Sequence, residues 1–561
     1  TAAPLPFLQS HLLNDPSIQA SLEAMEGYIK VDTPFDVDKL EAMLHDHPNQ
    51  PFVHSVLCGL WEGFWPFDKE EWKEECTLTS NYATEEEDLE AIRTFQDKEY
   101  AGDHWSPELP ISDLLPGMKL SPMFVVWQKE KAHVITDHSR SGINNEIPKA
   151  KAKVWYDDMH NFGQALREAQ KAFPGHSFVM FKSDVASTFL NLPAHLLWQL
   201  HQVVTVDGRL HIMQHLVFGN RASPRIWCIV SGLPCWLVIR KLDLTCLFVY
   251  MDDFFGWDFA DNLLCPCCQV QLLLFWESIW CPFEDKKQEH GEVLKIIGFW
   301  VDANNGSLSL SPFSVDDILD KIKSFLATPG CKPLLRDWQC LGGHINWLLN
   351  VLPWGRPAIT ELYQKTSRKC HPLSGIPINA QVISDLSWLA SVIPKAIGIH
   401  FVDDGMWPNS EADMVIWIDA SLKLGLAFIF LNQAFVYPLA AYLPEVKVKI
   451  FFLEMVAILS AIHYVASLSR LPCRLLIHTD SLNSVAVFNS LQASEALHNG
   501  PLLAATGVVL ESGIDLHVRH IPSKLNIHAD MLSHLLFEEY HLKYPADRIR
   551  LFSPPRDLLL A

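Results

Sequence analysis

The sequence predicts an α/β (α+β) multidomain protein, and three observations lead to this prediction. At 561 residues the chain is too long for one ordinary hydrophobic core, so several domains are expected. Short apolar strand candidates alternate with helical stretches twice, from about residue 109 to 326 and again from about 414 to 535. Hydrophobic residues make up 49% of the chain and charged residues 19%, which excludes a disordered or low-complexity protein.

Five segments are expected along the chain. The first is acidic and includes a helix over 38–47, the second and fourth hold the two α/β patterns, and the third is helical with breaks at prolines. The last is rich in Pro and Arg and is expected to be a linker. In chain order the segments are 1–105 (acidic N-terminal region), 106–326 (first α/β pattern), 327–410 (helical), 411–536 (second α/β pattern) and 537–561 (linker).

The net charge is unevenly distributed. Forty-four Lys and Arg against 65 Asp and Glu give −21, which taken alone argues against a nucleic-acid partner. Residues 1–100, however, hold 21 acidic and 6 basic residues, a net charge of −15. The remainder of the chain is therefore close to neutral, and the whole-chain charge does not exclude binding to nucleic acid.

Cysteine usage favours a reducing, intracellular compartment, and the sequence does not specify whether this is the cytoplasm or the nucleus. The 13 cysteines are scattered and the chain is large, so free thiols in a reducing compartment are expected. Cys265, Cys267 and Cys268 are either packed thiols or half of a zinc site, and packing is favoured because no matching Cys/His pair follows. No apolar run reaches the length of a membrane span. The chain begins at Thr1 with no targeting pattern, so it is expected to be part of a longer product.

A first set of acids lies at the ends of apolar strand candidates. Asp252 and Asp253 separate the strand candidate Leu247–Tyr250 from a second apolar run, a pattern typical of a β-hairpin with acids at its turn. Upstream, Phe178-Val-Met-Phe181-Lys-Ser-Asp184 is a strand candidate that ends in an acid. An exposed Asp-Asp turn is the simpler interpretation of the pair alone. Three carboxylates together predict a divalent-metal cluster of the kind that transfers phosphoryl groups from nucleoside triphosphates.

A second set of acids follows the same logic in the C-terminal half. Asp419 and Asp480 each follow an apolar strand candidate, and Asp530 lies further along the chain. Glu454 is the only formally charged residue of the apolar helical stretch 451–467, where a lone buried carboxylate costs several kcal/mol unless it is paired. Taken singly, each of these acids is more often structural.

Four segments of the first α/β pattern resemble, in order, the motifs of reverse transcriptases. The resemblance implies a right-hand polymerase with fingers, a palm with an RRM/ferredoxin-like core, a thumb and a connection. The matching segments are Asp184-Val-Ala-Ser-Thr-Phe189 (motif A), Phe218-Gly219-Asn-Arg-Ala-Ser-Pro224 (motif B), Tyr250-Met-Asp252-Asp253 (motif C), and Lys286-Lys287 with Ile297-Gly-Phe299 (motif D).

The resemblance also assigns roles to these residues. It implies that Asp184, Asp252 and Asp253 hold two Mg²⁺ ions, and that an aromatic ring at Phe189 excludes a ribose 2′-hydroxyl. Phe218 and Gly219 belong to the element that packs under the incoming nucleotide and the template base. By the same resemblance, Lys286 or Lys287 supplies a proton to the departing pyrophosphate.

One position departs from the family pattern. The segment Val134-Ile-Thr-Asp137-His-Ser-Arg140 resembles part of the fingers, but His133 stands where the family usually has an arginine that grips the triphosphate. A neutral imidazole is a poorer phosphate ligand than a guanidinium. Lys129, Lys131 and Arg140 are alternative triphosphate ligands, and His133 is equally well explained as a surface histidine.

The second set of acids resembles ribonuclease H in order and surroundings. The similar segments are Asp419-Ala-Ser, the helical Glu454, Thr479-Asp480-Ser, and Asn526-x-x-Ala-Asp530-x-Leu-Ser533. The resemblance implies an RNase H-like α/β domain that holds two more Mg²⁺ ions, with Mn²⁺ as an alternative, and cleaves the RNA strand of an RNA·DNA hybrid. His520 and His528 are expected to serve the fold.

A polymerase followed by a connection and ribonuclease H is an order found in retroviruses and retrotransposons. Gly342-Gly-His-Ile-Asn346 and Asn350-Val-Leu-Pro-Trp-Gly-Arg356 are most similar to fungal tyrosine-recombinase (DIRS-type) elements. The implied partners are an RNA template, a DNA primer, the RNA·DNA hybrid and dNTPs, with a recombinase domain downstream in a longer polyprotein. Two alternatives stay open: a domesticated, catalytically weakened nucleic-acid-binding protein, and a nuclease with ribonuclease H activity only.

Overall fold

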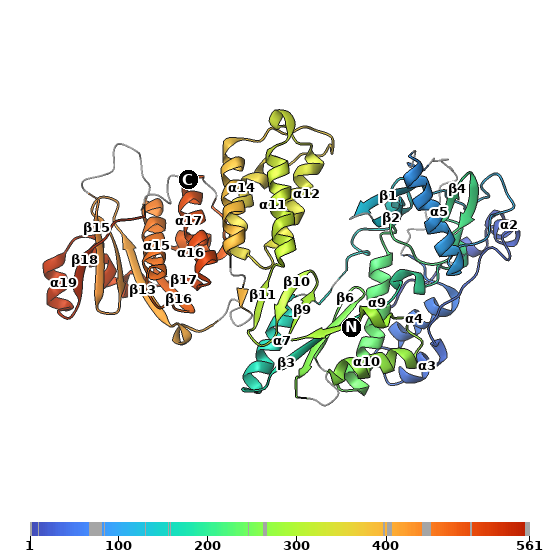
Figure 1. The fold of residues 1–561 in the computed structure, drawn as a ribbon, viewed down its shortest axis with the longest axis horizontal. Helices are drawn as coiled ribbons and strands as arrows, with labels where there is room; N and C mark the ends of the chain where they lie inside the picture. Colours follow the sequence, from blue (N-terminus) through green and yellow to red (C-terminus); the bar gives the residue numbers. More distant parts are fainter. Residues whose placement is uncertain are drawn as a thin grey trace. The chain divides into compact units, whose positions relative to one another are not determined.

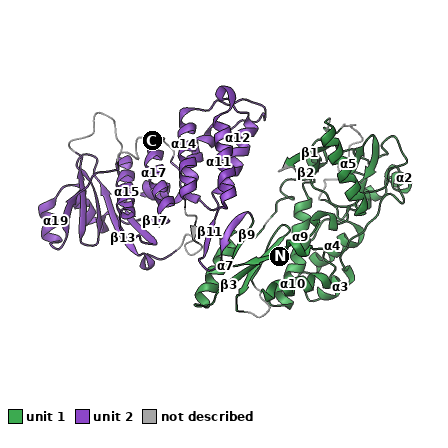
Figure 2. Cartoon of the chain, in the orientation of Figure 1, with its two compact units in different colours: residues 1–297 green, residues 298–561 purple. Residues whose placement is uncertain are grey.

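The protein is described by a computed structural model that divides into two compact units, residues 1–297 and 298–561 (Figure 2). Among the described helices, none combines the length and apolar character that a bilayer crossing requires. The structure describes residues 3–8, 10–66, 81–82, 85–128, 131–154, 156–157, 159–244, 246–261, 266–396, 399–400, 407–439, 450–493 and 496–555.

Unit 1 combines helices with short antiparallel sheets (Figure 1). Its helices are α1 (Ser10–Leu13), α2 (Pro16–Ala24), α3 (Val37–Met43), α4 (Gln50–Glu62), α5 (Glu86–Ala101), α6 (Ile143–Glu146), α7 (Met159–Ala172), α8 (Leu196–Gln199), α9 (Ser223–Lys241) and α10 (Cys267–Ser278), with the short 3₁₀ helices η1 (Thr188–Asn191) and η2 (Asp285–Lys287). Its strands are β1 (Met123–Gln128), β2 (Lys131–Thr136), β3 (Phe178–Asp184), β4 (Val203–Val206), β5 (Arg209–Ile212), β6 (Leu247–Tyr250), β7 (Asp253–Phe259), β8 (Glu289–Gly291) and β9 (Val293–Ile296).

The central sheet of unit 1 has the strand order β6-β7-β3-β8, with antiparallel neighbours. Strand β3 buries Phe178 to Phe181 on both faces and then alternates, so that Ser183 is buried while Lys182 and Asp184 are partly exposed. This alternation follows from the two-residue repeat of a strand. It places Lys182 and Asp184 on the same face of the sheet. Strand β6 has the bounds predicted from the sequence.

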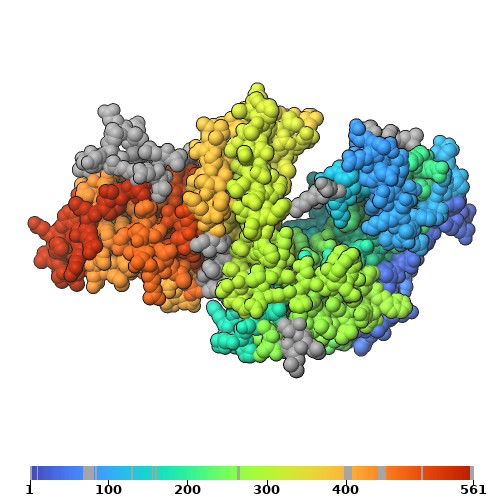
Figure 3. Space-filling model, viewed as in Figure 1, coloured from blue at the N-terminus to red at the C-terminus, as the bar shows by residue number. Residues whose placement is uncertain are grey.

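The acidic N-terminal region shares the core of unit 1. Buried side chains such as Leu40 and Val56 belong to the same hydrophobic cluster as Phe181 and Trp227. In the space-filling view the blue N-terminal atoms are continuous with the cyan and green atoms of unit 1 (Figure 3). Helix α3 begins after the N-cap Asp36, whose carboxylate accepts an N–H, and ends four residues before the expected boundary. The acidity of this region therefore lies on a packed part of the fold.

Unit 2 begins with the antiparallel strands β10 (Phe299–Asp302), β11 (Ser307–Ser309) and β12 (Ile399–His400) and a group of helices. The described residues between 327 and 396 are largely helical, and α11 precedes this stretch. The helices are α11 (Pro312–Leu326), η3 (Pro329–Cys331), α12 (Leu335–Leu348), η4 (Pro353–Ile359), α13 (Thr360–Thr366), α14 (Ala380–Val392) and η5 (Ile393–Lys395).

The second part of unit 2 is a six-stranded mixed sheet with helices on both faces (Figure 1). The strand order is β17-β16-β13-β14-β15-β18. The strands are β13 (Met414–Ala420), β14 (Gly425–Phe430), β15 (Gln433–Pro438), β16 (Arg474–Thr479), β17 (Asp515–His520) and β18 (Arg548–Leu551). The helices are α15 (Ile450–Ala466), α16 (Leu482–Ser490), α17 (Ala496–Ser512), α18 (Ile527–Ser533) and α19 (Phe537–Lys543), with the 3₁₀ helices η7 (Asn409–Glu411) and η8 (Ser523–Leu525).

Alternating residues of β14 contribute to two different hydrophobic cores. Leu426 and Phe428 pack in the cluster that includes α15 and α17, whereas Ala427 and Ile429 pack in the cluster that includes α18 and α19. A strand buried on both faces explains why this segment is apolar at every position.

The structure differs from the linker expected over 537–561. Residues 537–551 form α19 and β18, and β18 pairs in parallel with β15 as the last strand of the sheet. Tyr540 is fully buried, and its hydroxyl donates a hydrogen bond to Asp547 at 2.6 Å. The Pro- and Arg-rich composition of the segment favours a linker, but the buried Tyr540 side chain and the short strand β18 attach it to the sheet. The other segment boundaries stay predictions.

Candidate active sites

The first set of acids lies where β3 meets the β6–β7 hairpin. Asp184 ends β3 and Asp253 begins β7, and the two residues are paired directly across the strands. Asp252 lies in the two-residue turn between β6 and β7, and its carbonyl oxygen accepts the Val185 N–H at 3.1 Å. The antiparallel register thus brings Asp184 close to the adjacent acids Asp252 and Asp253, the first of which lies 68 residues further along the sequence.

The turn that carries Asp252 has a strained backbone. Met251 has a positive φ of 54°, an uncommon conformation for a side chain other than glycine, asparagine or aspartate. Such a residue costs about 1–3 kcal/mol and persists where its surroundings hold it. The indole N–H of Trp227, on α9, donates to the Met251 carbonyl at 2.7 Å. This hydrogen bond joins the turn to the helix that follows the Phe218-Gly219 segment.

Two lysines contact the acids. The ammonium of Lys182 lies 3.4 Å from Asp253 Oδ1, and that of Lys287 lies 3.3 Å from Asp184 Oδ1. Burial raises the pKa of Asp252, and it raises the pKa of Asp253 to about 6 although the Lys182 charge acts in the opposite direction. Lys287 was expected at this site from the sequence, whereas Lys182 was not.

Phe189 lies next to Phe218, which precedes Gly219 in the chain. Phe189 is buried in η1, its ring centroid is 4.7 Å from that of Phe218, and the Phe218 side chain is 62% exposed. Gly219 has φ 102°, and a Cβ there would lie 2.0 Å from the Thr136 carbonyl oxygen, so only glycine fits. The Asn144 amide donates to the Gly219 carbonyl at 2.8 Å. These contacts present one exposed and one buried aromatic ring next to each other.

Several other basic residues singled out from the sequence do not contact the acids in the described part of the chain. Lys286 is exposed and pairs with Glu284 at 3.0 Å. Arg140 and His133 are exposed, and in the described part of the chain neither has a hydrogen bond or ion pair to the three carboxylates. Lys131 is exposed as well, and Lys129 lies outside the described residues. A ligand for the triphosphate therefore stays unassigned.

The buried His138, in the fingers-like segment, predicts a loss of stability in acid. Burial lowers its pKa from 6.5 to about 4. Below pH 6.5 the unfolded chain binds a proton that the folded chain does not, so stability falls as the pH drops from 6.5 to about 4, by about 3 kcal/mol. Urea unfolding of the His138→Leu variant should show a smaller decrease over this pH range. The exposed His133→Leu is the control, and an unchanged pH profile for His138→Leu would contradict the prediction.

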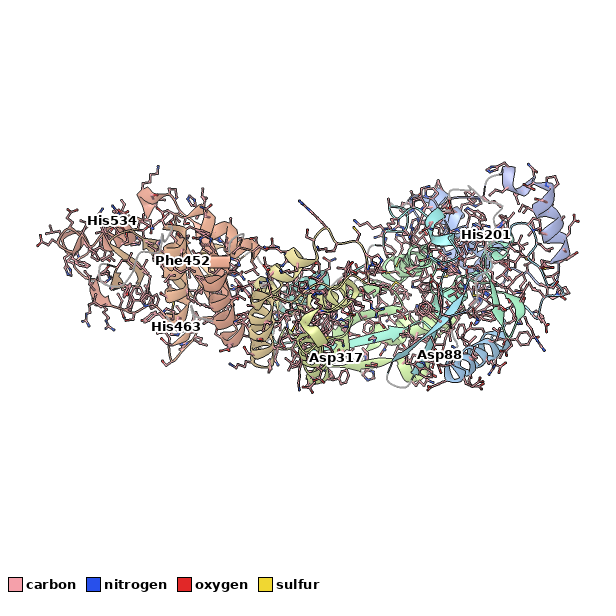
Figure 4. All side chains as sticks on the ribbon, turned by 90° about the horizontal axis from the view of Figure 1, so that it is seen from above. Asp88, His201, Asp317, Phe452, His463 and His534 are labelled. Atoms are coloured by element: carbon pink, nitrogen blue, oxygen red, sulfur yellow. The ribbon has the colours of Figure 1, made fainter. Side chains whose placement is uncertain are left out.

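In unit 2, Asp419, Asp530 and His534 offer ligand atoms within 4.8 Å of one another. Among the described residues this is the only group of three metal-ligating side chains that lie so close. Asp419 lies on β13 and Asp530 on α18. The Asn526 amide, fully buried, donates to the Ile418 carbonyl at 2.9 Å and so fixes the start of α18 beside β13. His534, labelled in Figure 4, follows α18, and its Nδ1 lies 3.4 Å from Asp530 Oδ1.

Glu454 and Asp480 complete this second set. The Ser481 and Ser484 hydroxyls, at the start of α16, donate to the Glu454 carboxylate on α15. The charge of Asp480, at the end of β16, raises the pKa values of both Glu454 and Asp419. Asp480 is therefore close enough to act electrostatically on both the acid on α15 and the acid on β13.

Burial dominates the electrostatics of this second set. It raises the pKa of Asp419 to about 7, while a hydrogen bond from the Ser533 hydroxyl acts in the opposite direction. Burial also raises the pKa of Glu454. His528 packs against the rings of Trp417 and Tyr544, which agrees with its expected role in the fold. The serines and His534 were not expected from the sequence.

Both sets of donor atoms suit hard divalent cations. The donors are carboxylate oxygens, the ligands that Mg²⁺ prefers, and His534 adds an imidazole to one set. The lysine ammonium groups at Asp184 and Asp253 show that the first set attracts positive charge.

For the cysteine cluster, Cys265 lies outside the described residues, and Cys268 contacts the Cys246 thiol and Asp258.

No protein-family model matches the sequence, and neither does any curated protein. Among solved structures, the chain is similar to three structures of the foamy viral protease-reverse transcriptase. One, a dRH form in complex with double-stranded DNA, is 13% identical, with 92% of this chain and 84% of that chain covered. A complex with an RNA/DNA hybrid is 13% identical, with 92% and 64% covered. Another complex with double-stranded DNA is 14% identical, with 88% and 98% covered. Each TM-score is 0.43.

Proposed function

We propose that the chain is an RNA- and DNA-directed DNA polymerase with ribonuclease H activity. The observation that supports it best is that each unit holds a group of neighbouring carboxylates that belongs to one of the two sets of motifs. The groups are Asp184, Asp252 and Asp253 in unit 1, and Asp419, Glu454, Asp480 and Asp530 in unit 2.

In unit 1 the three acids would hold two Mg²⁺ ions. Bound there, the ions would activate the primer 3′-hydroxyl and neutralise charge on the leaving pyrophosphate. Phe189 borders the space beside the exposed Phe218 ring, where it would exclude a ribose 2′-hydroxyl. Lys287 is the better placed of the two motif D lysines to give a proton to pyrophosphate, because its ammonium already contacts Asp184.

In unit 2 the four acids would hold the metal ions of a ribonuclease H. Bound there, the ions would activate water and stabilise the departing 3′-oxygen of the RNA strand. Ser533 orients Asp419, and Ser481 with Ser484 orients Glu454, through the hydrogen bonds described above.

An origin in a fungal tyrosine-recombinase retrotransposon, with a recombinase domain downstream, is part of the proposal and depends on the connection motifs alone.

Primer extension and hybrid cleavage by the full chain test the proposal. We expect Mg²⁺-dependent extension of a labelled DNA primer on an RNA template, and cleavage of labelled RNA in an RNA·DNA hybrid. Cleavage without extension, in Mg²⁺ and in Mn²⁺, would favour the nuclease-only alternative. Binding to the hybrid with neither reaction would favour the domesticated alternative. Either result would overturn the proposed polymerase.

A further inference from the structure

Lys182 occupies a fixed position relative to the acids of unit 1. It precedes Asp184 by two residues on β3, so both side chains lie on the same face. Asp184 is directly opposite Asp253 on β7, which makes Lys182 the diagonal neighbour of Asp253. Its ammonium lies 3.4 Å from Asp253 Oδ1, and the two side chains are only 21% and 19% exposed.

This arrangement offsets an unfavourable pairing. Like charges directly opposite one another on antiparallel strands destabilise a sheet, and Asp184 and Asp253 form such a pair. Among the described residues, the carboxylate oxygens of Asp184, Asp252 and Asp253 do not all lie within 4.8 Å of one another. Lys182 contacts Asp253, and Lys287 contacts Asp184. The positive charge that a metal ion would bring is thus partly supplied by the chain.

The two lysines differ in how firmly they are placed. Lys287 is 45% exposed, is the last residue of the short helix η2, and shares its ammonium with Glu284 at 3.1 Å. Lys182 lies within the central strand, and its backbone is fixed by pairing with β7 on one side and β8 on the other. The Gln269 amide also donates to the Lys182 carbonyl at 3.2 Å. Lys182 is therefore the more rigidly held cation.

We infer that Lys182 is a positioning residue that acts through Asp253: it holds this carboxylate when no metal is bound and competes with divalent metal for it. The inference deepens the proposed function and rests on its metal site in unit 1. A metal ion that uses Asp253 must displace the ammonium or share the carboxylate with it. Lys182 therefore sets the metal concentration that the site requires.

Titration of the full chain with Mn²⁺ alone, followed by the electron paramagnetic resonance signal of free Mn²⁺, tests the inference. An Asp480→Asn background weakens the site in unit 2, so that the unit 1 site is read separately. We expect Lys182→Met to lower the apparent Mn²⁺ dissociation constant about fivefold, because the competing charge is lost while an unbranched side chain is kept. Lys182→Arg should leave the constant nearly unchanged.

Two controls separate this role from a general charge effect. Lys241→Met removes an exposed lysine of unit 1, paired with Asp46 at 2.5 Å, and should not change the constant. In an Asp253→Asn background, Lys182→Met should have no further effect, as expected of two residues that act through one contact. A merely structural role would predict equal effects in both backgrounds.

The possible failures have different signatures. If no Mn²⁺ binding is lost in an Asp184→Asn variant, the proposed metal site of unit 1 is wrong. If that binding is present but Lys182→Met leaves its dissociation constant unchanged, the site stands and the inference about Lys182 is overturned.

Discussion

Asp252→Asn is expected to reduce primer extension by about 10²–10³-fold while RNA cleavage in a hybrid continues. Asp252 lies in the hairpin turn beside Asp184 and Asp253, where burial raises its pKa and a bound cation would favour its ionised form. An amide has nearly the same shape but no charge. Losing one group that stabilises transition-state charge costs about 3–4 kcal/mol, which corresponds to the expected fold-change.

The matched control for this variant is Asp243→Asn. Asp243 precedes β6, is exposed, and has a positive φ of 57° that asparagine also adopts readily. Single-turnover extension of a DNA primer on an RNA template compares the two variants with the parent chain. Extension by Asp252→Asn at the parent rate, in Mg²⁺, would show that the hairpin acids are not the polymerase site.

Much of the first site follows from patterns of short range. The strand candidate 247–250 has the bounds of β6, and the Asp-Asp pair lies at the predicted turn. The strand candidate 178–184, which ends in an acid, likewise has the bounds of β3, and its polar last residues continue the pairing with β7.

Contacts made by side chains far apart in the sequence could not be predicted in the same way. Lys182 could have been placed on the same face as Asp184 from the two-residue repeat, but its pairing with Asp253 depends on the strand register. Ser481 bonds to Glu454 on another helix, and His534 lies near Asp419 because α18 packs beside β13. Each contact depends on tertiary packing, which a periodicity does not specify.

Asp480→Asn is expected to abolish RNA cleavage in a hybrid while leaving primer extension intact. Asp480 acts electrostatically on the carboxyl groups of both Asp419 and Glu454. In the proposed site its charge would help to hold the metal ions, and we expect its loss to decrease cleavage by about 10²–10³-fold. Extension persists because the acids of the first set belong to the other compact unit.

The control for this last variant is Asp316→Asn, an exposed acid on α11 in the same unit. A 5′-labelled RNA strand annealed to DNA reports cleavage, and an unlabelled template with a labelled primer reports extension in the same preparation. With Asp252→Asn, this variant gives a reciprocal pair, in which each substitution removes one reaction and keeps the other. Loss of both reactions in either variant, with the chain folded by circular dichroism, would contradict two independent sites, because each set of carboxylates is built entirely from residues of its own unit.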